Sequence, residues 1–488
     1  MESQGGLNAR ALTGKGPQSF SMKKQSAWLI SIALLVLPSL AFAQSRPWIS
    51  DRAIGEGMGI RTGDFELHPG VAGELGYDSN YFQRSGTAPT SATFQGVDQP
   101  TYAAYRLRIT PSLTLATLGH QRKLGDSQSA MPPQFTFRST LFASYNELFA
   151  AGRSFDFGSQ RHIDGGANLG FEILPERPFS FDGSGSFARS VAPSTDPAIV
   201  NSWNRDMVGV GAGATWRPGG GMFDWRFGYD LRYTYFEADS YRYLTSLNHN
   251  VNTRGRFKFL PRTALVYDGS VAFQRYTNVT PGSGLGRNDG DILQARLGVN
   301  GLVTNRFSIL ALFGWASTFF EPTVTPVRSN YNSLVGQAEL DWYVLPQPKL
   351  QPGDATVGLS VIGLGYVRDI AISYLADYYR RDRGYAKVSY FVGGRFLIDL
   401  QGGYSLITHP AFFSRGQPFA GAKEDRVDAQ LFAEYRTSDS LGLNATLRYD
   451  GSLTNQYLRY NGTATSSAIE DNLAFSRFQA WLGVRWFM

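Results

Sequence analysis

The side chains best suited to chemistry are scattered along this chain. The five histidines are His68, His120, His162, His249 and His409, and none has the close spacing of a metal-binding pair. His162 and Asp164 would share one face of a strand, but the sequence places no serine beside them as a hydrolase would require. The Gly-rich segment 282–286 lacks the Lys-Ser/Thr of a phosphate-binding loop and is interpreted as an outer loop. We therefore expect no enzyme activity, no metal and no cofactor.

Basic residues at alternate positions are more informative. In a strand such residues point to one side, and a charged track inside a pore selects the ions and solutes that pass. Eight cations fit this pattern and are predicted to line a lumen: Arg106, Arg108, Arg226, Arg232, Arg254, Arg256, Lys258 and Arg296. The alternative is that these cations pair with lumen acids and only brace the wall. The acids named for that role are Glu339, Asp341, Asp399 and Glu434, with Asp224 and Asp230 as the nearest candidates.

The segment 223–235 must position two of these arginines, and it alternates strictly. Its odd positions are aromatic or apolar, and its even positions are charged, polar or Gly. This period of two predicts a strand with one apolar and one wet face. Aromatic residues at both ends of the apolar face are typical of a strand whose outer face meets lipid.

The same alternation recurs from residue 65 to residue 488. We count about 18 strands, within a range of 16–20, with an all-β fold: a single transmembrane antiparallel β-barrel. In one strand the pattern assigns Val357, Leu359, Val361 and Val367 to a common apolar face. Short periplasmic turns containing Pro or Gly should alternate with long extracellular loops. The long loops are predicted near 79–101, 190–203, 276–290, 319–331, 370–383, 408–424 and 454–473. The alternative is a soluble all-β protein of several domains.

The start of the chain predicts export. Met22-Lys23-Lys24, an apolar run over 27–37 and Ala41-Phe42-Ala43 form a secretory signal peptide over 22–43. Residues 1–21 look like an unrelated upstream extension, so Met22 is expected to be the translated start. Residues 44–64 are expected to be a periplasmic segment before the barrel at 65–488. The 0 cysteines and the formal net charge of +6 give no disulfide framework and no sign of nucleic-acid binding.

Two short segments carry a family resemblance. The final residues resemble the C-terminal signal of outer-membrane barrels; the signal residues are Gly483, Trp486, Phe487 and Met488, and Met488 stands where Phe is usual. The segment 76–82, Gly-Tyr-Asp-Ser-Asn-Tyr-Phe, resembles a segment of the outer-membrane barrels called the β-barrel porin 2 family.

The family resemblance implies an outer-membrane location in a Gram-negative bacterium, after cleavage of the signal peptide. Members of the family are commonly associated with exopolysaccharide loci, which implies a channel that passes solute or a polysaccharide chain. The implied partners are outer-membrane lipids, the barrel-insertion machinery and polysaccharide-export components, with no nucleic acid and with the oligomeric state open. The alternative is a structural or adhesive barrel with a closed lumen that acts through its outer loops.

Overall fold

The computed structural model describes most of the region beyond residue 56. The described residues are 57, 59–86, 95–96, 100–118, 133–152, 155–191, 204–218, 221–281, 286–325, 330–344, 360–373, 375–392, 395–414, 417–460 and 469–488. The expected signal peptide, the extension before it and most of the segment 44–64 lie outside these residues, as does most of the Gly-rich segment 282–286.

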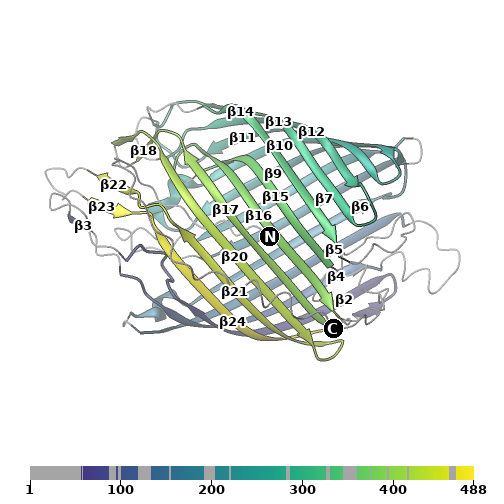
Figure 1. Cartoon of the computed structure of the whole chain (residues 1–488), viewed down its shortest axis with the longest axis horizontal. Helices are drawn as coiled ribbons and strands as arrows, with labels where there is room; N and C mark the ends of the chain where they lie inside the picture. The colour runs from purple at the N-terminus through teal and green to yellow at the C-terminus, as the bar shows by residue number, and fades with distance from the viewer. Residues whose placement is uncertain are drawn as a thin grey trace.

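Eighteen long strands of the described chain form one closed antiparallel barrel (Figure 1), which confirms the predicted fold class and strand number. They are β2 (Phe65–Asp78), β4 (Ala104–Thr117), β5 (Phe135–Ala150), β6 (His162–Ile173), β7 (Phe179–Ser190), β8 (Arg205–Trp216), β9 (Phe223–Phe236), β10 (Ser246–Leu260), β11 (Thr263–Tyr276), β12 (Gly290–Leu302), β13 (Phe307–Phe320), β14 (Asn332–Tyr343), β15 (Ser360–Ile372), β16 (Tyr378–Val392), β17 (Phe396–His409), β20 (Ala422–Arg436), β21 (Leu441–Ser452) and β24 (Phe475–Phe487).

Shorter elements decorate the two ends. They are β1 (Ile60–Thr62), β3 (Gln95–Gly96), the 3-10 helices η2 (Phe157–Gln160) and η4 (Asp239–Leu244), β18 (Phe412–Ser414), β19 (Gln417–Phe419), β22 (Tyr457–Tyr460) and β23 (Ile469–Asn472).

The barrel closes between its first and last long strands. β24 pairs with β2 from Gly70 opposite Phe487 to Asp78 opposite Gln479. Beyond the end of β24, β1 pairs with the start of β2 and continues the same edge. Closure leaves no long strand of the barrel with a free edge. A strand in lipid must be paired on both sides, because the bilayer core offers no hydrogen-bond partners.

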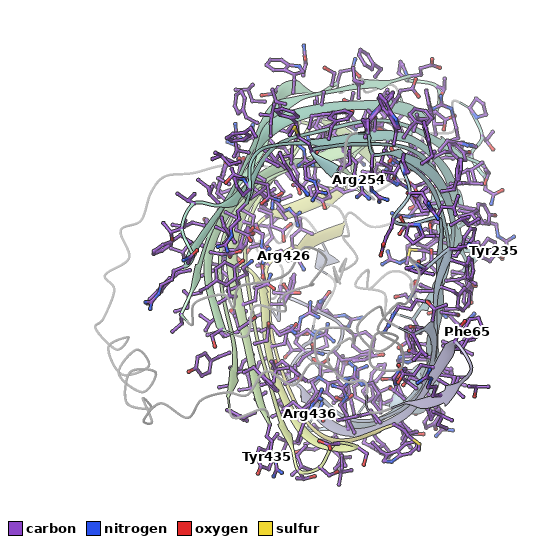
Figure 2. The ribbon with its side chains drawn as sticks, turned by 90° about the vertical axis from the view of Figure 1, so that its right-hand side faces the viewer. Phe65, Tyr235, Arg254, Arg426, Tyr435 and Arg436 are labelled. Carbon is purple, nitrogen blue, oxygen red and sulfur yellow. The ribbon has the colours of Figure 1, made fainter. Side chains whose placement is uncertain are left out.

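The outer surface is apolar and its ends are aromatic. Figure 2 shows Phe65, Tyr235 and Tyr435 outside the barrel, whereas Arg254 and Arg426 lie inside it. Large apolar side chains are exposed on the outer face of many strands, Phe227 at 54% among them. Aromatic pairs mark both ends of this belt, such as Phe307–Trp342 (6.4 Å between ring centroids) and Tyr77–Tyr105 (5.7 Å). An apolar band between aromatic girdles is the exterior of a transmembrane barrel. Among the described residues, no helix is long and apolar enough to cross a membrane.

The two ends of the barrel differ in their connections. We call one the turn end, because hairpins such as 261–262 and 437–440 close there, and the opposite one the loop end. Two turn-end connections, after β4 and after β14, lie largely outside the described residues. The predicted long loop 370–383 is wrong, because β15 runs to Ile372 and β16 begins at Tyr378. The alternation of apolar and polar residues is lost there, because the outer face itself carries charges: Arg368 is paired with Asp382 (2.5 Å).

One predicted strand face is also wrong. β15 places Ile362, Leu364 and Tyr366 outside, because they are paired with the outward residues of β14. Val361 and Val367 therefore face the lumen, whereas Val357 and Leu359 lie outside the described residues. Both faces of this strand carry apolar residues, so the sequence pattern did not indicate which face points to lipid.

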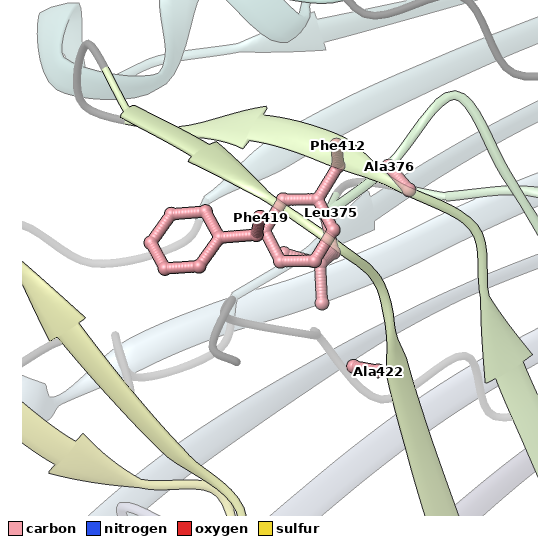
Figure 3. Packing of buried hydrophobic residues seen from close by; sticks show 5 residues of the cluster. All are labelled: Leu375, Ala376, Phe412, Phe419 and Ala422. Carbon is pink, nitrogen blue, oxygen red and sulfur yellow. The ribbon is translucent and has the colours of Figure 1, made fainter. Parts of the chain in front are cut away.

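Loops at the loop end pack into small apolar clusters. In Figure 3, Phe412 of β18 and Phe419 of β19 stack against one another, with 5.0 Å between ring centroids, beside Leu375 and Ala376 of the β15–β16 connection. The buried Asn288, from the β11–β12 loop, donates through Nδ2 to Thr325 Oγ1 (2.8 Å) of the β13–β14 loop. Neighbouring loops therefore support one another above the strands.

Candidate functional site

The inner wall of the barrel is the candidate site, and all eight predicted cations lie on inward positions of the register. One row across four strands shows the arrangement: Arg226 of β9 is opposite Arg254 of β10, Arg254 is opposite Asp268 of β11, and Asp268 is opposite Arg296 of β12. Directly opposed side chains in a sheet lie about 4.5–5.5 Å apart at Cβ. Three guanidinium groups and one carboxylate therefore share a narrow strip of wall.

Five of the eight cations are paired with a carboxylate. Three of these pairs lie around the β9–β12 strip: Arg226 with Asp182 (2.6 Å), Arg256 with Asp224 (2.5 Å) and Arg296 with Asp268 (2.9 Å). The other two lie on β4: Arg108 with Glu74 (2.5 Å) and Arg106 with Asp78 (3.7 Å). These five cations brace the wall.

Three cations have no carboxylate partner among the described residues: Arg232, Arg254 and Lys258. We call these three residues of β9 and β10 the cationic wall. All three are exposed. Asp224 is taken by Arg256, and Asp230 instead accepts a hydrogen bond from Asn252 Nδ2 (2.6 Å). The cationic wall therefore keeps a local excess of positive charge.

The four acids expected to brace the wall contact residues other than the eight predicted cations. Glu339 and Asp341 share Lys387, with Nζ–O distances of 2.5 and 3.0 Å, and Glu434 binds Arg485 (2.7 Å). Asp399 accepts a hydrogen bond from Ser389 Oγ (2.6 Å). None of these four contacts reaches the cationic wall.

A second charged region lies where the barrel closes. Asp78 is fully buried, and it accepts hydrogen bonds from Arg477 Nη2 (2.5 Å) and Gln479 Nε2 (2.8 Å). Glu434, 1% exposed, accepts from Arg436 Nε (3.2 Å) and Arg485 Nη1 (2.7 Å). We call Asp78, Glu434 and their arginine partners the seam wall.

Aromatic rings complete the seam wall. The inward Trp481 lies beneath Arg108 and Arg106, at 4.3 and 4.9 Å from guanidinium carbon to ring centroid. Arg106 also approaches the ring of Tyr81 (5.7 Å), just beyond β2. Burial raises the pKa of Tyr81 to about 12, against an opposing effect of Arg106, so the hydroxyl stays neutral. Cations stacked on buried rings are held in place rather than offered to a solute.

The predicted assembly residues lie in the same seam. A Cβ on Gly483 would lie 2.5 Å from Glu74 Cγ, so a larger residue would crowd this ion pair. Trp486 points outward and is 43% exposed. Phe487 is buried beneath Arg436, with 5.0 Å between the guanidinium carbon and the ring centroid. The Met488 amide donates to Pro69 O (3.0 Å). The last residues thus hold β24 to β2. Recognition of these residues by the insertion machinery stays a prediction.

The segment 76–82 also serves closure. A Cβ on Gly76 would lie 2.4 Å from the Trp481 ring, so glycine leaves room for the tryptophan. The buried Asn80 donates to Ser476 O (3.1 Å) and Arg84 O (2.7 Å), which fastens the end of β2 to β24. These contacts give the family-like residues a structural role.

The histidines form no metal cluster within the described residues. His162 Nε2 lies 3.3 Å from Asp164 Oδ2, so the two do share one face as expected. Ser144 is opposite Asp164 in the register, but its Oγ lies 2.8 Å from Thr110 Oγ1.

Some residues that line the lumen were not predicted from the sequence. Trp481 occupies the same face as Arg477, Gln479 and Arg485, so the alternation places it inside. Leu310 and Leu312 of β13 also face the lumen, but that strand is apolar on both faces and carried no such signal.

Comparisons with solved structures gave distant likenesses. No family model and no curated protein matches the chain. The FrpB iron transporter of Neisseria meningitidis (F3-3 variant) is 8% identical with a TM-score of 0.43, covering 86% of this chain and 81% of its own. The outer membrane protein opdK of Pseudomonas aeruginosa is 10% identical with a TM-score of 0.42, covering 87% and 99%. Acinetobacter baumannii OccAB4 is 10% identical with a TM-score of 0.40, covering 87% and 98%. Such values carry no inference about the function of this chain.

The geometry itself defines the class. A closed antiparallel barrel of eighteen strands, apolar and aromatic outside and charged inside, is a transmembrane β-barrel.

Proposed function

We propose that the chain is an outer-membrane channel that passes anionic solutes in preference to cations. The observation that carries this proposal is the cationic wall: Arg232, Arg254 and Lys258 are exposed and have no carboxylate partner among the described residues. Uncompensated charge facing a lumen bounded by low-dielectric walls raises the local concentration of counter-ions. A barrel of this strand number is also wide enough for an aqueous passage.

The proposed location follows from the exterior. The apolar belt would contact outer-membrane lipids, with the turn end in the periplasm and the loop end outside the cell. The insertion machinery is the proposed partner for Gly483, Trp486, Phe487 and Met488.

A bilayer recording tests the channel. The full chain, purified and inserted into a planar bilayer under a salt gradient, should conduct and show a reversal potential of the sign for anions. Replacing the cationic wall together, as Arg232→Gln, Arg254→Gln and Lys258→Gln, should move that potential most of the way to zero.

The matched control removes the same charge from exposed residues outside the lumen wall, as Arg177→Gln, Arg306→Gln and Lys423→Gln. This control should change the potential much less. A purified barrel that does not conduct would refute the channel. A conducting barrel with equal effects in both triple variants would refute the role of the cationic wall.

The finer proposal is that the solute is an acidic polysaccharide. Its support is the resemblance of residues 76–82 to an exopolysaccharide-associated family, together with the cationic wall. It implies polysaccharide-export components as partners. A strain lacking the protein should then secrete less acidic polysaccharide. Normal secretion would remove this finer proposal and leave a general channel.

A structural or adhesive barrel is the second candidate, favoured by the loop end. Asn288 joins neighbouring loops through Thr325 and through the backbone amide of Val324 (3.1 Å), so part of this end is internally braced. A non-conducting barrel with loop-dependent cell adhesion would support that function instead.

A further inference from the structure

A hollow of about 490 Å³ opens in the lumen wall near the turn end. Its lining comes from β8 to β13, with Arg226, Arg254 and Arg256 on one side and Leu310 and Leu312 on the other. Two carboxylates also line it, and each is already paired with an arginine: Asp224 with Arg256 and Asp268 with Arg296. The volume falls in the range of small-molecule sites, about 300–1,000 Å³.

The register explains why the wall is hollow there. One row runs from Arg256 through Val266 and Gly298 to Leu312. A Cβ on Gly298 would lie 1.7 Å from Ala311 O, so this position excludes any side chain. Short residues in the middle strands therefore form a floor between long side chains on β10 and β13.

The two sides of the hollow have opposite chemistry. Arg254 carries a guanidinium with no carboxylate partner among the described residues, whereas Arg256 forms an ion pair with Asp224. The opposite side offers aliphatic carbon from Leu310 and Leu312, which are partly exposed to the lumen. A guanidinium binds a carboxylate through paired charge-assisted hydrogen bonds, and apolar carbon stabilises an apolar group by removing it from water.

We propose that this hollow binds monocarboxylates that carry an apolar group. The carboxylate lies on Arg254, and the apolar group covers Leu310 and Leu312. The proposal rests on the proposed channel function, since such a ligand reaches the hollow through the lumen. It applies to the general anion channel and not to the acidic-polysaccharide proposal, because the anion that the hollow favours is amphipathic.

The lining disfavours two other anions. An inorganic anion would gain from Arg254 but leave the leucines in water. An acidic sugar would bring its ring hydroxyl groups against aliphatic carbon, where they lose hydrogen bonds to water without replacement. The hollow thus distinguishes anions by the group attached to the charge, and it favours an apolar one.

Calorimetry on the full chain in detergent micelles tests the site without requiring conduction. 3-Phenylpropionate should bind more tightly than acetate, which lacks the apolar group, and more tightly than 3-phenylpropan-1-ol, which lacks the charge. Arg254→Gln should weaken 3-phenylpropionate binding about tenfold or more, the usual effect of losing a hydrogen bond to a charged group.

Matched variants make the test specific. Arg232→Gln removes an equally unpaired cation outside the hollow and should change the affinity less than about twofold, since it loses no direct contact. Leu312→Asn should weaken 3-phenylpropionate severalfold while leaving acetate unchanged. Val367→Thr, at a lumen residue outside the hollow, should have no effect. Equal binding of acetate and 3-phenylpropionate, or an unchanged affinity in Arg254→Gln, would overturn the proposal.

The two proposals fail separately. If 3-phenylpropionate binds as described in a barrel that does not conduct, the channel is refuted and the hollow remains a binding site. If the barrel is anion-selective but neither Arg254→Gln nor Leu312→Asn changes binding, the hollow is refuted and the channel remains.

Discussion

The charged residues of the seam wall and those of the cationic wall are in opposite states. At the seam, Asp78 and Glu434 are buried and each accepts hydrogen bonds from two or more side chains. On the other wall, Arg232, Arg254 and Lys258 are exposed and have no carboxylate partner among the described residues. A buried charge is tolerated only when it is paired, whereas an exposed charge is solvated by water. Burial therefore separates the charges that hold the barrel together from those left for solutes.

The largest expected effect comes from cutting the seam itself. Deleting Trp486 to Met488 removes the buried Phe487 and the hydrogen bond from the Met488 amide to Pro69 O, so the pairing of β24 with β2 is weakened. We expect almost no folded protein in the outer membrane, measured by heat-dependent gel mobility of membrane fractions. The control is Met488→Phe, which changes an exposed side chain and keeps the backbone contacts. Normal levels of the deleted protein would show that closure depends on other residues.

The second prediction compares a carboxylate of the seam wall with a carboxylate that lies beside the cationic wall. Asp78→Ala leaves Arg477 and Arg106 without their buried partner, so it should lower the free energy of unfolding by about 3–5 kcal/mol. Asp224→Ala breaks an ion pair whose arginine side chain is 49% exposed and should cost less than about 1 kcal/mol. Urea unfolding in lipid vesicles measures both.

The same pair should separate in function. Asp224→Ala frees Arg256, which lies between Arg254 and Lys258 on the lumen face of β10, so a conducting barrel should become more anion-selective in bilayer recordings. Similar losses of stability in the two variants would break the distinction between the walls.

The smallest expected effect compares the two faces of the cationic wall's own strands. Phe227→Arg places a charge on the lipid-facing side of β9 and should cost about 2–4 kcal/mol at the bilayer midplane. Asn250→Arg places the same charge on the lumen face of β10, opposite Asp230, and should cost much less. Folded yield and urea unfolding measure the difference. Equal costs would mean that Phe227 does not face lipid.

The sequence determined the class of fold and most strand faces because both depend on local periodicity. The alternation in 223–235 is enough to place Phe227 outside and Arg226 inside, and the register agrees. Where the periodicity was ambiguous the prediction failed, as in β15, whose two faces are both apolar, and at 370–383, where charged residues on both faces resembled a loop.

Only the tertiary structure decided which cations are paired, because a partner on a neighbouring strand depends on register and on what lies between. Arg226 pairs with Asp182 two strands away, and its guanidinium crosses β8 over Gly213, where a Cβ would lie 2.4 Å from Nη2. Lys387 similarly crosses Gly363 to reach Asp341. Arg254 is opposed by a second arginine and by an aspartate already bound to Arg296. The sequence therefore placed the cations on the wall, and three-dimensional pairing left Arg254 among those available to a solute.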